Sequence, residues 1–206
     1  MICRIHHLAC LVGMAFCVWR PWQACAATPL EWKEHEVVVF LGGANTVSMQ
    51  KAGYLEALLT QQFARAHPIF RDLSWESDTV FEQGTVIERW REQAHFDEDG
   101  GLGDLNQQLK RCGATMIFAQ FGQSESMEGE GKLSAFTKAY EQLIESWLQE
   151  KYQVVLLTPT PFEEPASPHL PNLELHNRLL AQYVEAIKKL GRDYRLIVVD
   201  LFHAPQ

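Results

Sequence analysis

The sequence has little cysteine once its first 26 residues are set aside. Four of the five cysteines, Cys3, Cys10, Cys17 and Cys25, lie in that segment, and only Cys112 follows it. A single cysteine can form neither an internal disulfide nor a cysteine metal cluster, so both are excluded for the rest of the chain. We expect Cys112, at the end of a predicted helix, to be a half-buried packing residue.

The sequence also lacks a basic cluster and a metal-binding pattern. It holds 18 Lys and Arg against 26 Asp and Glu, for a net charge of −8, which becomes −10 without Arg4 and Arg20 of the first segment. An acidic chain of this kind argues against nucleic acid or an anionic membrane surface as a partner. No metal or cofactor is expected, because the histidines outside the first segment show no mutual ligand spacing; they include His67, His95, His169 and His176.

No apolar run is long enough to span a bilayer comfortably. The run from Leu8 to Trp19 has 12 residues, whereas a membrane-spanning helix needs about 20. Arg4 precedes it and the small residues of Ala24-Cys25-Ala26 follow it, a pattern that predicts a signal peptide over residues 1–26, cleaved after Ala26. We therefore expect an exported protein, periplasmic or secreted, with no membrane contact after cleavage. An uncleaved anchor and a lipoprotein modified at Cys25 are the alternatives.

Five short apolar runs alternate with helical patterns in the remaining domain, residues 27–206. The predicted strands are Val37–Leu41, Ile69–Leu73, Thr115–Gln120, Gln153–Thr158 and Arg195–Asp200. The predicted helices are Gln50–Ala66, Val86–Ala94, Asp104–Arg111, Lys132–Glu150 and Leu173–Leu190. Nearly continuous apolar strands are typical of parallel sheets covered on both faces. The alternation therefore predicts an α/β three-layer αβα sandwich around a parallel five-stranded sheet.

Three irregular segments follow strand ends and would meet at one edge of that sheet: 74–85, 121–131 and 159–171. In open α/β sheets this edge is where ligands bind. The first strand leads into FLGGANT, residues 40–46, a glycine turn before a helix. That turn is where an α/β hydrolase carries its nucleophile, yet its centre holds no hydroxyl, thiol or carboxylate.

Read in order, these loops resemble the SGNH/GDSL hydrolases. The chain is similar to an exported bacterial subgroup whose blocks read FLGDSIT, NLGWSGDTV and GMNESF. The corresponding segments are FLGGANT at 40–46, DLSWESDTV at 72–80 and GQSESM at 122–127, followed by LLTP at 156–159, HNR at 176–178 and VDLF at 199–202. The resemblance implies a flavodoxin-like SGNH-hydrolase fold and an esterase lineage acting on carbohydrate or acyl esters.

The catalytic positions depart from the family pattern. By this resemblance, Ala44 stands where the family has its nucleophilic serine, and Gly43 where it has the preceding aspartate. Ser77 replaces the oxyanion-hole glycine and Ser124 the oxyanion-hole asparagine. Acyl transfer needs an activated nucleophile and fixed oxyanion donors, so these changes predict a domain that is catalytically dead or impaired.

Other residues near the turn could take over the missing roles. Thr46 and Ser124 are the candidates for a non-standard nucleophile, although Thr46 is more simply a helix N-cap. Asn45, Trp75 and Glu125 are candidate ligand-binding residues, with Asn45 alternatively serving a left-handed turn position. A glycan or a small ester is the ligand that the resemblance implies.

Asp200 and His203 match the Asp-x-x-His spacing of the family's catalytic pair. They could instead be a strand-end aspartate followed by a tail, because the subgroup's pair comes later than its Val-Asp-Leu-Phe segment. No helical pattern follows residue 200, so the C-terminal helix of the fold could be lacking and the sheet left with apolar surface for a protein partner at this edge. Three interpretations therefore stand: an impaired hydrolase-like domain, an active esterase or deacetylase with an unusual nucleophile, and a non-catalytic partner-binding module.

Overall fold

A computed structural model describes residues 27–83, 104–163, 165, 167, 169 and 171–204. Its centre is one sheet of five strands, in which every pairing is parallel and the order is β2-β1-β3-β4-β5. The strands are β1 Val37–Gly42, β2 Ile69–Asp72, β3 Met116–Gln120, β4 Gln153–Leu157 and β5 Ile197–Val199. The predicted parallel five-stranded α/β fold is confirmed, and its strand order is flavodoxin-like.

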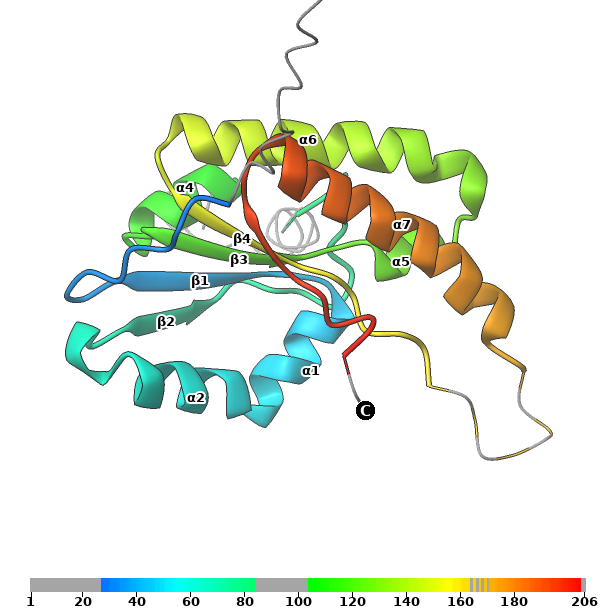
Figure 1. The fold of residues 1–206 in the computed structure, drawn as a ribbon, viewed down its shortest axis with the longest axis horizontal. Helices are drawn as coiled ribbons and strands as arrows, with labels where there is room; N and C mark the ends of the chain where they lie inside the picture. Colours follow the sequence, from blue (N-terminus) through cyan, green and yellow to red (C-terminus); the bar gives the residue numbers. More distant parts are fainter. Residues whose placement is uncertain are drawn as a thin grey trace, which may run out of the picture.

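Helices lie on both faces of the sheet (Figure 1). They are α1 Ala44–Ala52, α2 Tyr54–Gln62, α4 Leu105–Arg111, α5 Gln123–Ser126, α6 Leu133–Gln149 and α7 Glu174–Asp193, with 3₁₀ turns at Ala64–Ala66 and Glu130–Lys132. Helix α4 begins at a capping box in which Asp104 accepts a hydrogen bond from the Gln107 backbone. Cys112 caps its other end and is half-buried, as expected. The helix predicted over Val86–Ala94 lies outside the described residues.

The face of the sheet toward α4, α6 and α7 carries the larger core. Side chains at alternate strand positions, such as Val39, Ile117 and Leu156, pack there against buried aromatic side chains of the helices. Among these are Tyr140 and Trp147 of α6, both fully buried. Because alternate strand residues point to opposite faces, the intervening positions form a second core on the other side.

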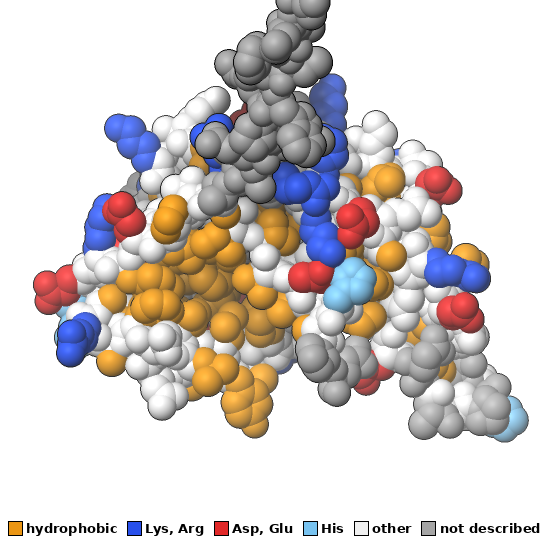
Figure 2. All heavy atoms as spheres, viewed as in Figure 1, with side chains coloured by type: hydrophobic (Ala, Val, Ile, Leu, Met, Phe, Trp, Pro, Cys, Tyr) orange, Lys and Arg blue, Asp and Glu red, His pale blue; other side chains and the backbone are white. Residues whose placement is uncertain are grey.

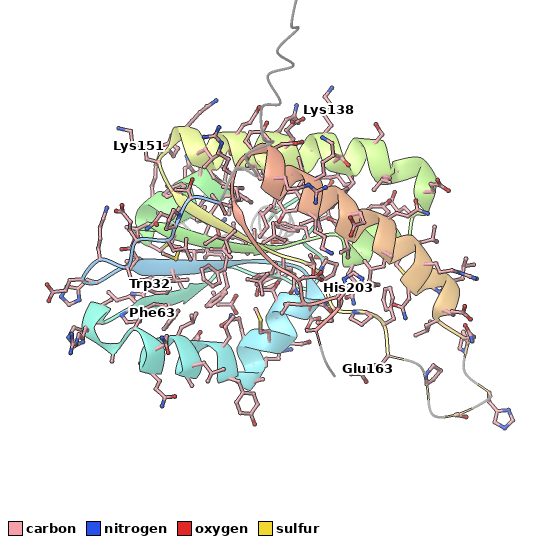
Figure 3. All side chains as sticks on the ribbon, in the orientation of Figure 1. Trp32, Phe63, Lys138, Lys151, Glu163 and His203 are labelled. Atoms are coloured by element: carbon pink, nitrogen blue, oxygen red, sulfur yellow. The ribbon has the colours of Figure 1, made fainter. Side chains whose placement is uncertain are left out.

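That second core is smaller and lies toward α1 and α2. Phe40, Phe118 and Val155 belong to it, with Met49 of α1 and Leu55 of α2 packed against them. A strap at the start of the domain crosses this side, and its Trp32 stacks on Phe63 with ring centroids 3.9 Å apart (Figure 3). Figure 2 shows hydrophobic side chains gathered over the middle of this face, so its helical cover is incomplete.

The single helix predicted over Gln50–Ala66 is wrong. Helix α1 begins six residues earlier, directly after the glycine turn, and Gly53 ends it in a left-handed conformation with φ +68°. A second helix, α2, then starts in a new direction. The predicted apolar stripe is divided as a result: Tyr54 and Leu58 are exposed, whereas Leu55 and Leu59 face the sheet.

The described chain ends shortly after the last strand. Within residues 171–204, β5 is the last regular element, and no helix follows it. Of the helices in the described part of the chain, none is both long and apolar enough to cross a membrane.

Candidate functional site

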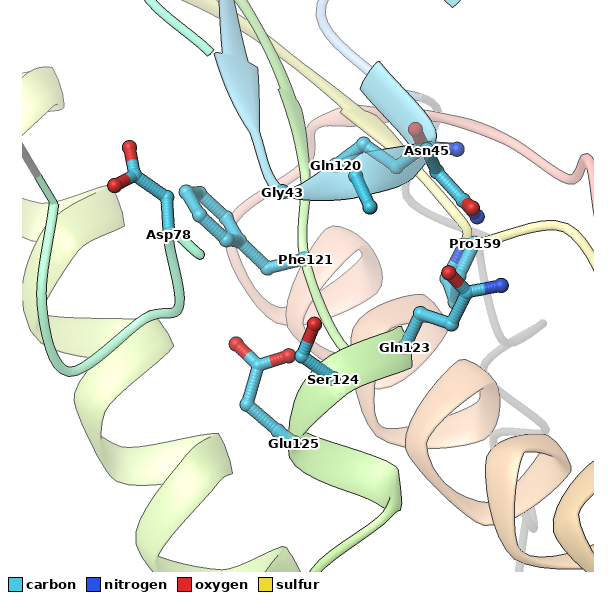
Figure 4. Close-up of a pocket in the computed structure, with 10 residues that line it drawn as sticks. Gly43, Asn45, Asp78, Gln120, Phe121, Gln123, Ser124, Glu125 and Pro159 are labelled. Atoms are coloured by element: carbon cyan, nitrogen blue, oxygen red, sulfur yellow. The ribbon is translucent and has the colours of Figure 1, made fainter. Parts of the chain in front are cut away.

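A small cleft lies at the carboxyl ends of β1, β3 and β4, where the order 2-1-3-4-5 reverses direction. Such a switch point is where open α/β sheets bind ligands. The cleft is shallow, with a volume of about 10 Å³, and Figure 4 shows the start of α1 and helix α5 approaching it from different sides. Its lining residues are Gly43, Ala44, Asn45, Asp78, Gln120, Phe121, Gln123, Ser124, Glu125 and Pro159.

The turn after β1 places Ala44 at the first position of α1. Gly42 has φ +151°, and Gly43 is the N-cap residue with no side-chain capping hydrogen bond. Ala44 is exposed, so its methyl group stands beside the cleft at a helix start, where the dipole favours developing negative charge. The position suits a nucleophile, but the side chain present cannot act as one.

Gly43 also fixes how closely the loop after β2 approaches. A Cβ atom added at Gly43 would lie 2.9 Å from the backbone oxygen of Asp78. A larger side chain at position 43, including an aspartate, therefore requires this loop to move. The loop is held in place by the Trp75 backbone N–H, which donates to the Gly42 oxygen at 3.0 Å.

Thr46 is not the N-cap that the sequence suggested, because it lies inside the first turn of α1. Its side chain is fully buried and donates a hydrogen bond to Gln120 Oε1 at 3.1 Å. The Gln120 amide in turn donates to the Thr158 backbone oxygen at 3.0 Å. Gln120, at the end of β3, thus joins the start of α1 to the end of β4. No motif predicts this role, because its partners are far away in the chain.

Asn45 lies within α1 and not at a left-handed turn position. Its amide donates to Thr160 Oγ1 at 3.0 Å, and the Gln123 amide donates to the Thr160 backbone oxygen at 3.3 Å. These two bonds tie the loop after β4 to both sides of the cleft. Asn45 therefore lines the cleft and also helps to close it; its role in ligand binding stays a prediction.

Glu125 is almost completely buried, at 2% exposure. One carboxylate oxygen accepts the Val80 backbone N–H at 2.8 Å and the other accepts the Gly122 N–H at 2.8 Å. Burial raises the pKa of this carboxyl above its ordinary value, while the backbone hydrogen bonds act in the opposite direction. The geometry makes Glu125 a clamp between the loop after β2 and helix α5 at the wall of the cleft.

The remaining predicted site residues divide between the cleft and its surroundings. Ser124 is exposed and lines the cleft, whereas Ser77 and Trp75 are exposed but are not among the lining residues. In the described part of the chain, no group of three or more His, Cys, Asp or Glu side chains is placed to hold a metal ion.

Asp200 and His203 form the contact that their spacing suggested. His203 Nδ1 lies 2.9 Å from Asp200 Oδ2, which also accepts from Lys188 Nζ at 2.7 Å (His203 is labelled in Figure 3). Thr158 Oγ1 accepts hydrogen bonds from the backbone N–H groups of Leu201 and Phe202, at 2.8 and 3.0 Å. The segment after β5 is therefore anchored to β4 and to α7, with the imidazole held by the carboxylate.

The Asp200 carboxylate should make the stability of the protein depend on pH. Partial burial disfavours its charge, but hydrogen bonds from Lys188 and His203 outweigh burial and hold the pKa of Asp200 well below its ordinary 3.8. A pKa lowered by folding stabilises the protein above 3.8, and this contribution is lost as the pH falls below that value.

We expect Asp200→Asn to lower the free energy of unfolding at pH 7 by about 1 kcal/mol, since solvent screens the pair in part. The difference from the unaltered protein should shrink below about pH 4 in urea titrations. Glu185 is the other carboxylate that pairs with Lys188, and its side chain is 62% exposed. Glu185→Gln should therefore change stability by only a few tenths of a kcal/mol. A difference that stayed constant from pH 7 to pH 3 would contradict this account of Asp200.

No protein-family model matches the chain, and no curated protein matches it. Solved structures do. A GDSL-like lipase from Parabacteroides merdae shares 14% identity at a TM-score of 0.56, over 82% of this chain and 78% of that one. The acetylxylan esterase Axe2 from Geobacillus stearothermophilus shares 14% at 0.58, over 83% and 78%. The gut microbial diltiazem-metabolizing enzyme BT4096 shares 16% at 0.62, over 86% of this chain but 39% of that one.

These similarities define the class of fold. The chain is a parallel α/β three-layer protein, and its fold is that of the SGNH/GDSL hydrolases. At 14–16% identity, these similarities show the fold alone.

Proposed function

We propose that this chain is an exported SGNH-fold domain of esterase lineage that no longer hydrolyses esters. The observation that carries the proposal is the position of Ala44, which is exposed beside the cleft at the first residue of α1. A methyl group there can neither attack an ester nor hold an acyl group. Loss of a catalytic nucleophile typically lowers turnover by about a million-fold.

The contacts of the two substitute nucleophiles support the same proposal. Thr46 is buried, and its hydroxyl is committed to Gln120. Ser124 is exposed, but a serine nucleophile needs an adjacent base. In the described ranges, no histidine is hydrogen-bonded to its hydroxyl; His203 is bonded to Asp200, and His35 pairs with Glu34.

A serine-to-alanine change is compatible with this fold elsewhere. A catalytic mutant of Axe2 with that replacement matches the chain at a TM-score of 0.58 and 15% identity. Unaltered Axe2 matches at the same TM-score of 0.58, so in that protein the replacement leaves the fold in place. A domain that has lost its nucleophile but kept its fold can still bind a ligand at the cleft.

We propose a glycan or a small ester as the ligand of that cleft. Its accessible polar groups are neutral: the amides of Asn45 and Gln123 and the hydroxyl of Ser124. Amide and hydroxyl groups suit the hydroxyl and carbonyl groups of such ligands, and the acetylxylan esterases among the similar structures act on ligands of this kind. Titration with acetylated xylo-oligosaccharides, followed by calorimetry, tests the idea; no heat at millimolar ligand would contradict it.

Export is the second part of the proposal. It rests on the basic, apolar and small-residue pattern of residues 1–26. The intact mass of the protein from the periplasm or medium of an expressing bacterium should correspond to a chain that begins at Ala27. A chain that kept its first 26 residues would contradict cleavage.

Hydrolysis of p-nitrophenyl acetate tests the loss of activity. The chain from Ala27 should show no turnover above the rate without protein. Ala44→Ser restores the hydroxyl alone, so its turnover should stay far below that of an ordinary esterase, in which a base activates the serine and which lacks the serines that occupy the oxyanion positions here, Ser77 and Ser124. Ala44→Val, which fills the same position without a nucleophile, is the matched control and should stay inactive. Turnover by the unaltered chain that Thr46→Val or Ser124→Ala abolishes would overturn the proposal.

A further inference from the structure

An apolar groove runs along the sheet face that α1 and α2 leave uncovered. Its floor is formed by β3 and β4, one wall by α1 and α2, and the other by β5 and the residue after Asp200. The groove holds about 270 Å³, and its lining residues are all apolar: Leu30, Trp32, Met49, Leu55, Leu59, Phe63, Phe118, Val155, Leu157, Ile197, Val199 and Leu201. Val199 remains 40% exposed. The exposed apolar surface lies on the walls, because the floor residues Phe118, Val155 and Leu157 are only 5%, 1% and 3% exposed. Exposed apolar side chains gathered in this way are typical of an interaction site.

The two strands beneath the groove match a short α-helix in length and width. Strands β3 and β4 have five residues each, which corresponds to about 17 Å along the strands. About 11 helical residues, or three turns, cover that length. Two neighbouring strands span roughly 10 Å, which is the diameter of a helix with its side chains. The opposite face of the same sheet, by contrast, is covered by helices α4, α6 and α7.

The chain also carries an apolar helix ridge that its own fold does not use. Helix α2 has nine residues and none of them is buried. Tyr54 is 77% exposed and Leu58 is 61% exposed. Being four residues apart, they lie on one stripe of the helix. Leu55 and Leu59 form the neighbouring stripe and line the groove, so the apolar surface continues from the groove over the crest of α2 (Figure 2).

We propose that the groove receives the α2 ridge of a second copy of this chain. A twofold axis makes the exchange reciprocal: each α2 lies in the partner's groove, and the two α2 helices pack side by side. Tyr54 and Leu58 then contact the partner's Phe118 and Val199. This proposal does not depend on the proposed loss of esterase activity.

The local charge favours a second copy despite the acidic character of the whole chain. Residues 44–66, which contain α1 and α2, carry Lys51 and Arg65 and one acid, Glu56. No acid is present among the residues that line the groove. Two copies can therefore approach at this surface without the repulsion that a net charge of −10 would produce elsewhere.

Sedimentation equilibrium of the chain from Ala27, between 1 and 100 µM, tests the proposal. The unaltered protein should be a dimer at the upper end of this range, and Leu58→Lys should be monomeric with an unchanged circular dichroism spectrum, since Leu58 is exposed. Leu175→Lys is the matched control: Leu175 is 57% exposed, on α7, and the variant should remain dimeric. A monomeric unaltered protein, or a Leu58→Lys variant that still dimerises, would overturn the proposal.

A mixing experiment tests the reciprocal geometry. Val199→Asp places an acid in the groove and should also be monomeric alone. Mixed with Leu58→Lys, it should form a one-to-one dimer, because that dimer has one native contact and one contact between the new lysine and the new aspartate. Failure of the mixture to associate would exclude α2 as the occupant of the groove.

Discussion

Gly42→Ala is expected to prevent the chain from folding. Gly42 has φ +151°, a conformation that residues with a side chain rarely adopt, and a Cβ atom there would collide with the Thr46 hydroxyl and the Gln120 backbone oxygen. Both neighbours are buried beneath the cleft and joined by a hydrogen bond. We expect a loss of more than about 4 kcal/mol, measured as the absence of a cooperative urea transition or of soluble protein.

Gly53→Ala is the matched control for this prediction. Gly53 also has a positive φ, of +68°, but no atom lies within 4 Å of the position that its Cβ would take. The change should lower stability by only about 1–2 kcal/mol, which is the conformational term alone. Equal losses in the two variants would show that the close packing around Gly42 does not contribute.

Glu125→Gln is expected to lower the free energy of unfolding by about 2–4 kcal/mol. The buried carboxylate accepts one backbone N–H with each oxygen, from Val80 and from Gly122. A glutamine offers one acceptor and places an amide donor against the second N–H, so one buried donor loses its partner. Because burial raises the pKa of Glu125 in the folded protein, the unaltered protein gains stability relative to the glutamine variant as this carboxyl takes up a proton, so the deficit should grow as the pH falls from 7 towards 4.5.

Glu128→Gln makes the same chemical change three residues later. Glu128 is exposed and pairs with Lys132 one turn away at 3.6 Å, an interaction that contributes little. Its replacement should change stability by less than about 0.5 kcal/mol. Equal urea midpoints for the Glu125 and Glu128 variants would show that the two hydrogen bonds accepted by Glu125 do not stabilise the protein.

The strands and the two long helices could be predicted because burial decides them. The runs that contain β1, β3 and β4 are almost uninterrupted and apolar, as expected for strands covered on both faces. Helices α6 and α7 present apolar side chains at helical spacing, and their stripes are buried. Both patterns involve residues close together in the chain, so the sequence alone is enough to predict these strands and helices.

The region between residues 44 and 66 could not be predicted in the same way. Gly53 interrupts a helical pattern that reads as one continuous stripe, and only the packing of α1 against the sheet shows where the first helix ends. The division of the leucines follows from that break: Leu59 faces the sheet while Leu58 faces outward.

The candidate site was predicted in position but not in its connections. The strand-end loops meet at the cleft as expected, with Ala44, Asn45, Ser124 and Glu125 in its lining. The bonds that hold the cleft join residues distant in sequence: Thr46 to Gln120, and Asn45 to Thr160. No periodicity or motif reports such contacts, since each depends on the register of neighbouring parallel strands.

The intact mass of the chain from Ala27 after exposure to a fluorophosphonate tests the central claim most directly. This reagent forms a stable adduct with an activated serine or threonine hydroxyl. The account predicts an unmodified mass, because Ala44 has no hydroxyl, Thr46 is buried against Gln120 and Ser124 has no basic partner among the described residues. A stoichiometric adduct that maps to Thr46 or Ser124 would mean that the site has a working nucleophile, and would contradict the account.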